Sequence, residues 1–236
     1  MRQVPQYCII GNGRMAKHFC HYLSILNISY SHWYRDSNLS LTNVIEQIPN
    51  ILLLISDSAI IPFIEDNPVL RSKQLFHFSG CLYTEQAYGF HPLMTFTHTL
   101  YDLKTYQQIP FICDDNAPVF SEVFPNLNNP VFTLPKSLKS KYHSFCVLSG
   151  NFTTILWKKF FHELSEQFNL EPNVAFPYLQ QIVKNLISNP KSALTGPLAR
   201  NDEATLSANL AALESDPFQQ VYAAFVNIKE TLNECH

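Results

Sequence analysis

The chain has 236 residues, of which 46% are hydrophobic and 15% charged, enough to bury one large or two modest cores. Its net charge of −3 gives no reason to expect nucleic acid or an anionic membrane as a partner. The low charged fraction favours a homodimer, because a second subunit can cover exposed apolar area.

The six cysteines are scattered along the chain without a C-x-x-C pair. This pattern indicates reduced thiols and predicts a cytoplasmic protein. The first strand starts so early that we expect no secretory signal. The apolar runs at 51–55 and 60–64 are too short and too interrupted for a membrane span.

An apolar strand at residues 6–10 leads into Gly11-Asn12-Gly13, and a helix follows from Arg14. The pattern is G-x-G-x-x-A, with Ala16 as the small third residue. In a dinucleotide-binding turn, the first glycine permits the reversal, the second admits a pyrophosphate, and the third lets helix and strand pack. The alternative is a glycine turn without a ligand. The residues predicted to contact a dinucleotide here are Gly11, Asn12, Gly13, Arg14 and Met15.

The first helix carries an apolar stripe up to Leu26, and Asn27 is its predicted C-cap. A second strand, residues 28–34, ends at Arg35, which lies 22 positions after Gly13. An acidic residue near this point binds the ribose of NAD, whereas an arginine accommodates the extra phosphate of NADP. Arg35 and Ser37 therefore predict NADP(H), unless Arg35 only pairs with Asp36.

The run at 51–55 is typical of a strand buried on both faces. Ser56 and Asp57 follow it and are predicted to lie near the middle of the cofactor, because strand ends line the crevice of such folds. Asp57 could equally be the N-cap of the next helix.

Two further strands, at 74–78 and around 89–96, bring histidines and a serine to their ends. Ser79 and His91 are predicted to line the nicotinamide end or the substrate pocket. His77, His91 and His98 match no standard ligand spacing, so we expect no metal site.

Strands at 111–113 and 131–134 complete the predicted sheet, and a joint rich in lysine and serine follows near 135–140. Helical periodicity then dominates, over 142–170, 172–186, 202–213 and 218–232. The predicted fold class is α/β: a Rossmann dinucleotide-binding domain (1–138) followed by an all-helical C-terminal domain (139–236) for substrate binding and dimerisation.

Several segments together resemble one family, the Rossmann-like proteins with an appended domain of unknown function, which are relatives of ketopantoate reductase and deazaflavin-dependent NADP reductases. The matching segments are 10–16 (IGNGRMA), 54–60 (LISDSAI), 77–80 (HFSG), 91–96 (HPLMTF), Tyr142-His143 with Asn151, and 193–202 (ALTGPLARND). Asn201 stands where a glycine is expected.

This resemblance implies a helical domain like that of 6-phosphogluconate dehydrogenase and an NADPH-dependent reductase of a small 2-oxo acid. Some members look like alternative ketopantoate reductases, which supply pantoate for pantothenate and coenzyme A synthesis. The leading interpretation is thus reduction of 2-dehydropantoate. An imine reductase of the pyrroline carboxylate type and a non-catalytic dinucleotide-binding sensor are the alternatives.

Reduction of a ketone also needs a proton donor and an anchor for the substrate carboxylate. Ketopantoate reductases place a lysine and asparagines on the first helix of the second domain, so the resemblance directs attention to His143, Lys141 and Asn151. A core histidine and a packing amide are the alternatives for His143 and Asn151. Thr195 and Arg200 are predicted to lie near the substrate, whereas Asp202 is predicted to be structural.

Overall fold

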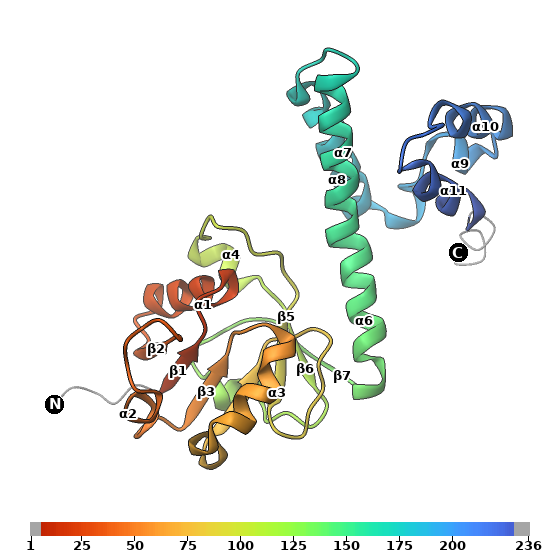
Figure 1. Cartoon of the computed structure of the whole chain (residues 1–236). Helices are drawn as coiled ribbons and strands as arrows, with labels where there is room; N and C mark the ends of the chain where they lie inside the picture. The colour runs from red at the N-terminus through yellow and green to blue at the C-terminus, as the bar shows by residue number, and fades with distance from the viewer. Residues whose placement is uncertain (1–5, 229–236) are drawn as a thin grey trace. The chain divides into compact units, whose positions relative to one another are not determined.

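The computed structural model describes residues 6–228 and divides into two compact units, with the boundary between Ile155 and Leu156. The N-terminal unit contains one seven-stranded sheet (Figure 1). Its strands are β1 (Tyr7–Ile10), β2 (Tyr30–Trp33), β3 (Asn50–Leu53), β4 (Gln74–His77), β5 (Tyr88–Pro92), β6 (Phe111–Asp114) and β7 (Val131–Leu134).

The strand order is β2-β1-β3-β4-β5-β6-β7, and every neighbouring pair is parallel except the antiparallel pair β5–β6. The chain moves outward from β1 to β2 and then returns to β3 on the other side of β1. This reversal creates a topological switch point between β1 and β3, which is where open α/β sheets bind ligands. The ends of both strands therefore border the expected crevice.

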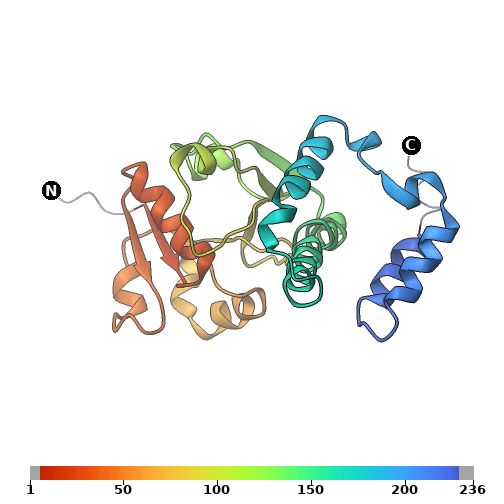
Figure 2. The ribbon, with the colours of Figure 1, turned by 90° about the horizontal axis from the view of Figure 1, so that it is seen from above.

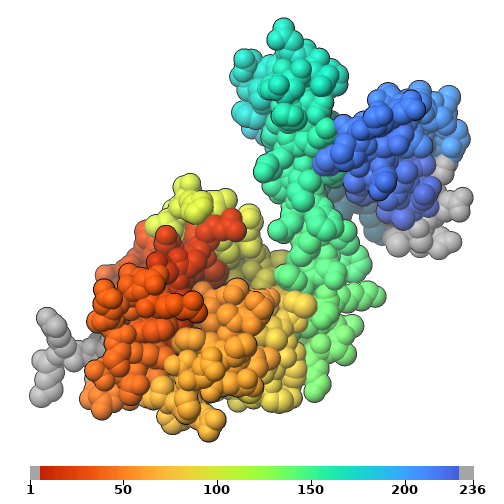
Figure 3. Space-filling model, in the orientation of Figure 1, coloured from red at the N-terminus to blue at the C-terminus, as the bar shows by residue number. Residues whose placement is uncertain are grey.

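Helices cover both faces of the sheet (Figures 1 and 2). Strand alternation explains the two cores: Tyr7 and Ile9 pack toward one face, while Cys8 and Ile10 pack toward the other. The first face is covered by α1 (Arg14–Ile25), α4 (Leu103–Gln107) and α5 (Phe120–Val123). The second is covered by α2 (Leu41–Ile45), α3 (Asp57–Asp66) and the short η1 (Pro68–Ser72). In the space-filling view, the side chains of α2 and α3, in orange, close over the strands (Figure 3).

A continuous helical segment starts after the short η2 (Lys136–Leu138) and crosses the boundary between the units. It consists of α6 (Lys139–Cys146), the π-helical η3 (Val147–Phe152) and α7 (Thr153–Glu166). The π-helical part bonds each N–H to the fifth residue before it, so its turns are wider than those of an α-helix. The sequence periodicity predicts helix here but does not predict this widening.

The C-terminal unit is entirely helical over its described residues. Besides most of α7, it contains η4 (Pro172–Ala175), α8 (Phe176–Ser188), η5 (Pro190–Ser192), α9 (Gly196–Arg200), α10 (Glu203–Ala212) and α11 (Gln219–Asn227). Lys159 joins two parts of this unit, because its ammonium lies 2.7 Å from both Glu163 and Asp216. The end of the last predicted helix, beyond residue 228, lies outside the described residues.

Two asparagines explain local departures from the expected pattern. Asn27 follows the C-cap residue Leu26 and has a φ of 55°, so it occupies the left-handed position just past α1. Asn201, which stands where a glycine is expected, also has a φ of 55° and caps α9. Asparagine is the residue besides glycine that most readily adopts this conformation, so the substitution is compatible with the turn.

Over residues 6–228, the predicted strands and helices are confirmed with small shifts in their ends. The predicted boundary at residue 138 remains a prediction, since α6 begins at Lys139 but the two compact units divide inside α7. Within residues 6–228, no helix combines the length and the apolar composition that a membrane crossing requires.

Candidate active site

Gly11 holds the turn after β1 against the end of β3. Its φ is +126°, and a Cβ at this position would overlap the carbonyl oxygen of Leu54. The turn is further fixed by the His32 ring, whose Nε2 donates to the Gly11 carbonyl at 2.6 Å. The Gly11 N–H donates to the Trp33 carbonyl at 2.9 Å. The turn is therefore tied to both neighbouring strands and cannot accommodate a side chain at Gly11.

Gly13, by contrast, faces open space, because no atom lies within 4 Å of the position a Cβ would take. It is the N-cap of α1, no side chain caps that end, and no acidic residue occupies the first turn. Asn12, Gly13 and Arg14 are exposed, while Ala16 is fully buried against the sheet. The first N–H groups of α1 are thus available to an anion, as the glycine pattern predicts.

The end of β2 presents a basic and a hydroxyl side chain. Arg35 is exposed, and Ser37 lies two residues further on in the same turn. The Ser37 hydroxyl oxygen is buried and makes no hydrogen bond to any residue within 6–228. A buried hydroxyl without a partner costs free energy unless a ligand or water bonds it. The two residues therefore fit a phosphate at this strand end.

Asp57 and Ser79 bond to each other at the ends of β3 and β4. The Ser79 hydroxyl donates to Asp57 Oδ2 at 2.5 Å and accepts the N–H groups of Cys81 and Leu82 at 3.2 and 2.9 Å. Asp57 is the first residue of α3, and Ser56 is its N-cap. The predicted N-cap role thus falls on Ser56. The Ser79 hydroxyl stabilises the loop after β4, and these hydrogen bonds explain its position without a ligand.

Three polar side chains gather at the carboxyl ends of β4 and β5. His91 Nδ1 lies 3.0 Å from the Tyr142 hydroxyl, and the His91 and His143 rings lie 5.9 Å apart at a right angle. Gly80 lies beside them, and a Cβ there would overlap the rings of both His143 and His91. We call His91, Tyr142 and His143 the His–Tyr–His cluster. It exists because β5 and α6 approach each other over a residue without a side chain.

The surroundings of the His91 ring keep this imidazole uncharged at neutral pH. Burial, with the charges of His143 and Lys139 as further causes, lowers the pKa of His91 to about 4. Burial also raises the pKa of the Tyr142 hydroxyl well above its usual range, with the neighbouring Cys146 adding to the effect. At neutral pH, a neutral imidazole therefore bonds a protonated phenol, and the pair can orient or relay a proton without carrying charge.

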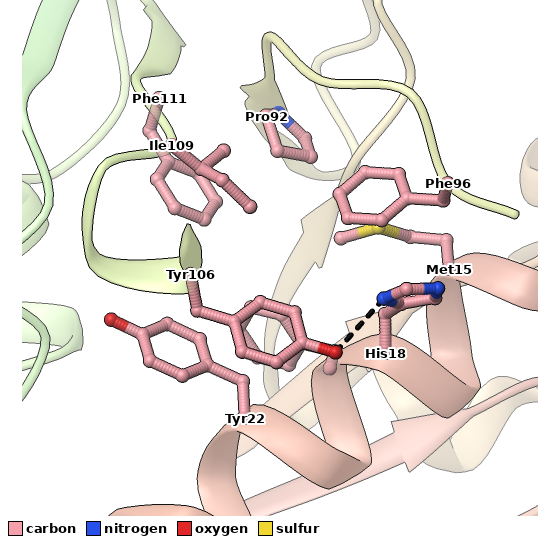
Figure 4. Close-up of a pocket in the computed structure, with 9 residues that line it drawn as sticks. Met15, His18, Tyr22, Pro92, Phe96, Tyr106, Ile109 and Phe111 are labelled. Carbon is pink, nitrogen blue, oxygen red and sulfur yellow. Dashed lines mark hydrogen bonds between the residues drawn. The ribbon is translucent and has the colours of Figure 1, made fainter. Parts of the chain in front are cut away.

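An apolar hollow lies on the opposite face of the sheet from α3, between α1, α4 and the loop after β5 (Figure 4). Its volume of about 10 Å³ is far too small for a substrate. Met15, predicted to contact the cofactor, lines this hollow with its side chain. His18 bonds the Tyr106 hydroxyl at 2.9 Å and donates to the Thr97 carbonyl at 3.0 Å, which ties the loop to α1.

The remaining predicted residues are not brought into the His–Tyr–His cluster by any described contact. Lys141 is exposed on α6, and Asn151 is exposed in the π-helical η3. Thr195 is the N-cap of α9 and Arg200 its last residue, both in the C-terminal unit. Asp202 is structural, as predicted, because its carboxylate caps α10 through the N–H and hydroxyl of Thr205.

Sequence reasoning missed one lysine. Lys139 is buried and pairs with Asp114, whereas the prediction named Lys141. Helical periodicity indicates that Lys139, four residues before His143, shares its face, while Lys141 lies on the other side of the helix. It does not indicate that Asp114 lies opposite Lys139.

Comparisons with known proteins agree with this architecture. A family model described as "Domain of unknown function (DUF2520)" matches residues 113–228. No curated protein sequence matches the chain. Among solved structures, a candidate NADP oxidoreductase from Bacteroides fragilis has 20% identity and a TM-score of 0.75, covering 94% of this chain and 96% of that one.

Two similar structures contain a bound nucleotide. An imine reductase from Myxococcus stipitatus in complex with NADP+ has 14% identity and a TM-score of 0.64, over 98% of this chain and 95% of that one. A reductive aminase from Aspergillus terreus, in complex with NADPH and ethyl levulinate, has 13% identity and a TM-score of 0.63, over 98% and 93%. At these identities the likeness establishes the fold: a Rossmann domain followed by a helical C-terminal domain.

The two glycines of the turn should respond differently to substitution. Gly11→Ala is expected to lower the free energy of unfolding by about 3 kcal/mol, because its Cβ would overlap the Leu54 carbonyl in a backbone conformation that disfavours side chains. Gly13→Ala, whose Cβ meets nothing, should lower it by about 1 kcal/mol at most, the effect of alanine at an N-cap. Urea unfolding followed by circular dichroism measures both. Equal losses in the two variants would contradict this account of the turn.

Proposed function

We propose that the chain is an NADP(H)-dependent reductase acting on a carbon–oxygen or carbon–nitrogen double bond of a small molecule. One observation carries the proposal. The uncapped start of α1, above the open space at Gly13, lies at the same edge of the sheet as the His–Tyr–His cluster. Parallel strands bring their carboxyl ends to one edge, so a nucleotide site and a proton-bearing cluster occupy the same crevice.

The residues of the nucleotide site fit a dinucleotide with an added phosphate. The N–H groups at the start of α1 would hold the pyrophosphate, with Asn12 and Arg14 at its side. Arg35 and the unpaired hydroxyl of Ser37 would hold the 2′-phosphate. Ser56 and Asp57 would lie along the middle of the cofactor. The NADPH and NADP+ bound in the similar reductases support this assignment.

When bound, NADPH supplies the hydride for the reduction. The chain's own residues must then deliver a proton to the oxygen or nitrogen that gains negative charge. His91 is neutral and bonded to Tyr142, so it serves to orient the cluster rather than to act as the acid. His143 lies beside it and is only half-buried, which makes it the proposed donor.

Two substrate classes fit the same site. The sequence resemblance favours a 2-oxo acid, with 2-dehydropantoate as the first choice. The names of the similar structures favour an imine, because they include imine reductases and reductive aminases. Both classes need a hydride and a proton, so only substrate tests separate them.

We also propose a homodimer formed through the helices. Among residues 156–228, the only buried apolar side chains are Leu164, Ala175 and Leu206, a small core for a unit of this size. Val183, Leu186 and Ile187 of α8 are 46%, 51% and 80% exposed. Apolar side chains left uncovered over a small core are typical of a unit that is completed by another subunit.

Arg35→Ala should separate the two nicotinamide nucleotides. The loss of a charge-assisted bond to the 2′-phosphate is expected to weaken NADPH binding about 10- to 100-fold and to leave NADH binding unchanged. Fluorescence titration with each nucleotide gives both dissociation constants. Arg71→Ala, which removes an exposed arginine in η1, is the matched control. An equal loss for both nucleotides would argue that Arg35 does not contact the added phosphate.

His143→Ala should reduce turnover about 100-fold or more, because it removes the proposed proton donor. The assay follows NADPH oxidation with 2-dehydropantoate, pyruvate and 1-pyrroline-2-carboxylate in parallel, and Lys141→Ala is the control on the same helix. A loss confined to Lys141→Ala would move the donor to Lys141. Turnover with the cyclic imine alone would reject the 2-oxo acid, and no turnover with bound NADPH would leave a sensor.

The dimer has its own test on α8. Val183→Glu combined with Ile187→Glu puts two carboxylates on one apolar face and should convert a dimer into a monomer of about 27.1 kDa in sedimentation velocity. Lys184→Glu, on an exposed position of the same helix, should leave the mass unchanged. A wild-type chain that sediments as a monomer at micromolar concentration would rule out the proposed dimer.

A further inference from the structure

A buried ion pair lies directly beneath the His–Tyr–His cluster. The Lys139 ammonium donates to Asp114 Oδ1, and the two side chains are only 5% and 3% exposed. Asp114 is the last residue of β6, and Lys139 is the first residue of α6. The pair therefore joins the sheet to the start of the helix that carries Tyr142 and His143.

Gly89 of the sheet gives the Asp114 carboxylate a second hydrogen-bond donor, and its missing side chain leaves space for the ion pair. The Gly89 N–H donates to Asp114 Oδ2 at 3.0 Å. Phe90 pairs with Cys113 in the antiparallel register, so Gly89 lies opposite Asp114. A Cβ at Gly89 would overlap both the Asp114 carboxylate and the Lys139 ammonium. A glycine in the middle of β5 is unfavourable in itself, and its presence here is explained by the ion pair it admits.

His77 lies on the other side of Gly89 in the parallel register of β4 and β5. Its Nε2 is 3.9 Å from Asp114 Oδ2, beyond hydrogen-bond distance, and neither ring nitrogen has a partner among the described residues. Burial, with the Lys139 charge as a second cause, lowers the pKa of His77 to about 3. His77 is therefore neutral, and the Asp114 carboxylate is matched by one cation, Lys139.

The spacing on α6 links this pair to the cluster above it. Tyr142 and His143 follow Lys139 by three and four residues, so all three side chains lie on one face of the helix. The helix can present Tyr142 to His91 and His143 to Gly80 only in the rotation that also inserts Lys139 toward Asp114. An apolar residue at 139 could pack in several rotations, whereas an ammonium beside one buried carboxylate has a single position.

We propose that Lys139 and Asp114 position the reaction site by fixing the rotation of α6, so that Tyr142 and His143 meet His91 at the strand ends. Lys139 is a positioning residue, since it is buried and does not reach the crevice. The proposal rests on the proposed function for its effect on turnover. Its structural part, the orientation of His91 by Tyr142, exists in the protein without cofactor and can be measured there.

The test uses the double variant Lys139→Met with Asp114→Asn. It removes both charges, keeps a side chain of similar length at 139 and leaves an oxygen for the Gly89 N–H. Either single change would leave an unpaired group buried and could prevent folding. The control is Lys136→Met with Glu85→Gln, which removes an exposed pair at 4.0 Å, three residues before Lys139. Circular dichroism and thermal unfolding verify that each variant is folded.

The primary measurement is ¹⁵N NMR of the histidine rings in the protein without nucleotide. In the wild type, His91 is expected to show a single tautomer fixed by Tyr142. The double variant should show mixed tautomers, because without the ion pair Tyr142 is no longer held against the His91 ring. The control variant should keep the single tautomer of the wild type.

Turnover and binding provide the second measurement. The double variant should bind NADPH within about twofold of the wild type yet turn over about 100-fold more slowly, the effect expected of a displaced catalytic group. A folded double variant with the wild-type His91 tautomer and turnover would overturn the proposal. If the wild type shows no turnover, the proposed function fails, and the His91 spectrum alone still decides whether the ion pair positions the cluster.

Discussion

The close approach of Gly11 to the Leu54 carbonyl is the constraint on which the site depends. It ties the turn after β1 to the end of β3, and the Leu54 N–H strengthens this link by donating to the Ile10 carbonyl at 2.8 Å. Because the turn cannot move away from the sheet, the start of α1 is held at the switch point between β1 and β3. The crevice expected there is a consequence of strand order, and the missing side chain at Gly11 lets the turn approach the end of β3.

Three glycines of the N-terminal unit lie where a Cβ would overlap another group of the protein. Gly11 admits a backbone carbonyl, Gly80 admits two imidazole rings, and Gly89 admits a buried ion pair. Gly13 differs, since nothing in the protein approaches it. The contrast separates glycines that allow the protein to pack from one that leaves room for something else, and only the latter has the character of a binding position.

Polar groups in the N-terminal unit can be divided in the same way, into those that are bonded within the protein and those that are left for a ligand. Ser79 and Asp57 satisfy each other and the loop between them, so their chemistry is used within the fold. The hydroxyl of Ser37, in contrast, is buried without a partner among the described residues. Burial without a partner is costly in a folded protein, so this hydroxyl indicates where a ligand would add a missing hydrogen bond.

The sequence by itself determined the order of strands and helices, the glycine turn and its buried third residue Ala16, because local periodicity and turn chemistry carry that information. It also indicated the stretch that holds Tyr142 and His143. Only the tertiary structure decided which lysine is buried. Asp114 and Lys139 are 25 residues apart, and they meet because β6 lies beside β5 and because Gly89 leaves space between them. Long-range register sets such contacts, and no local pattern in a single sequence records it.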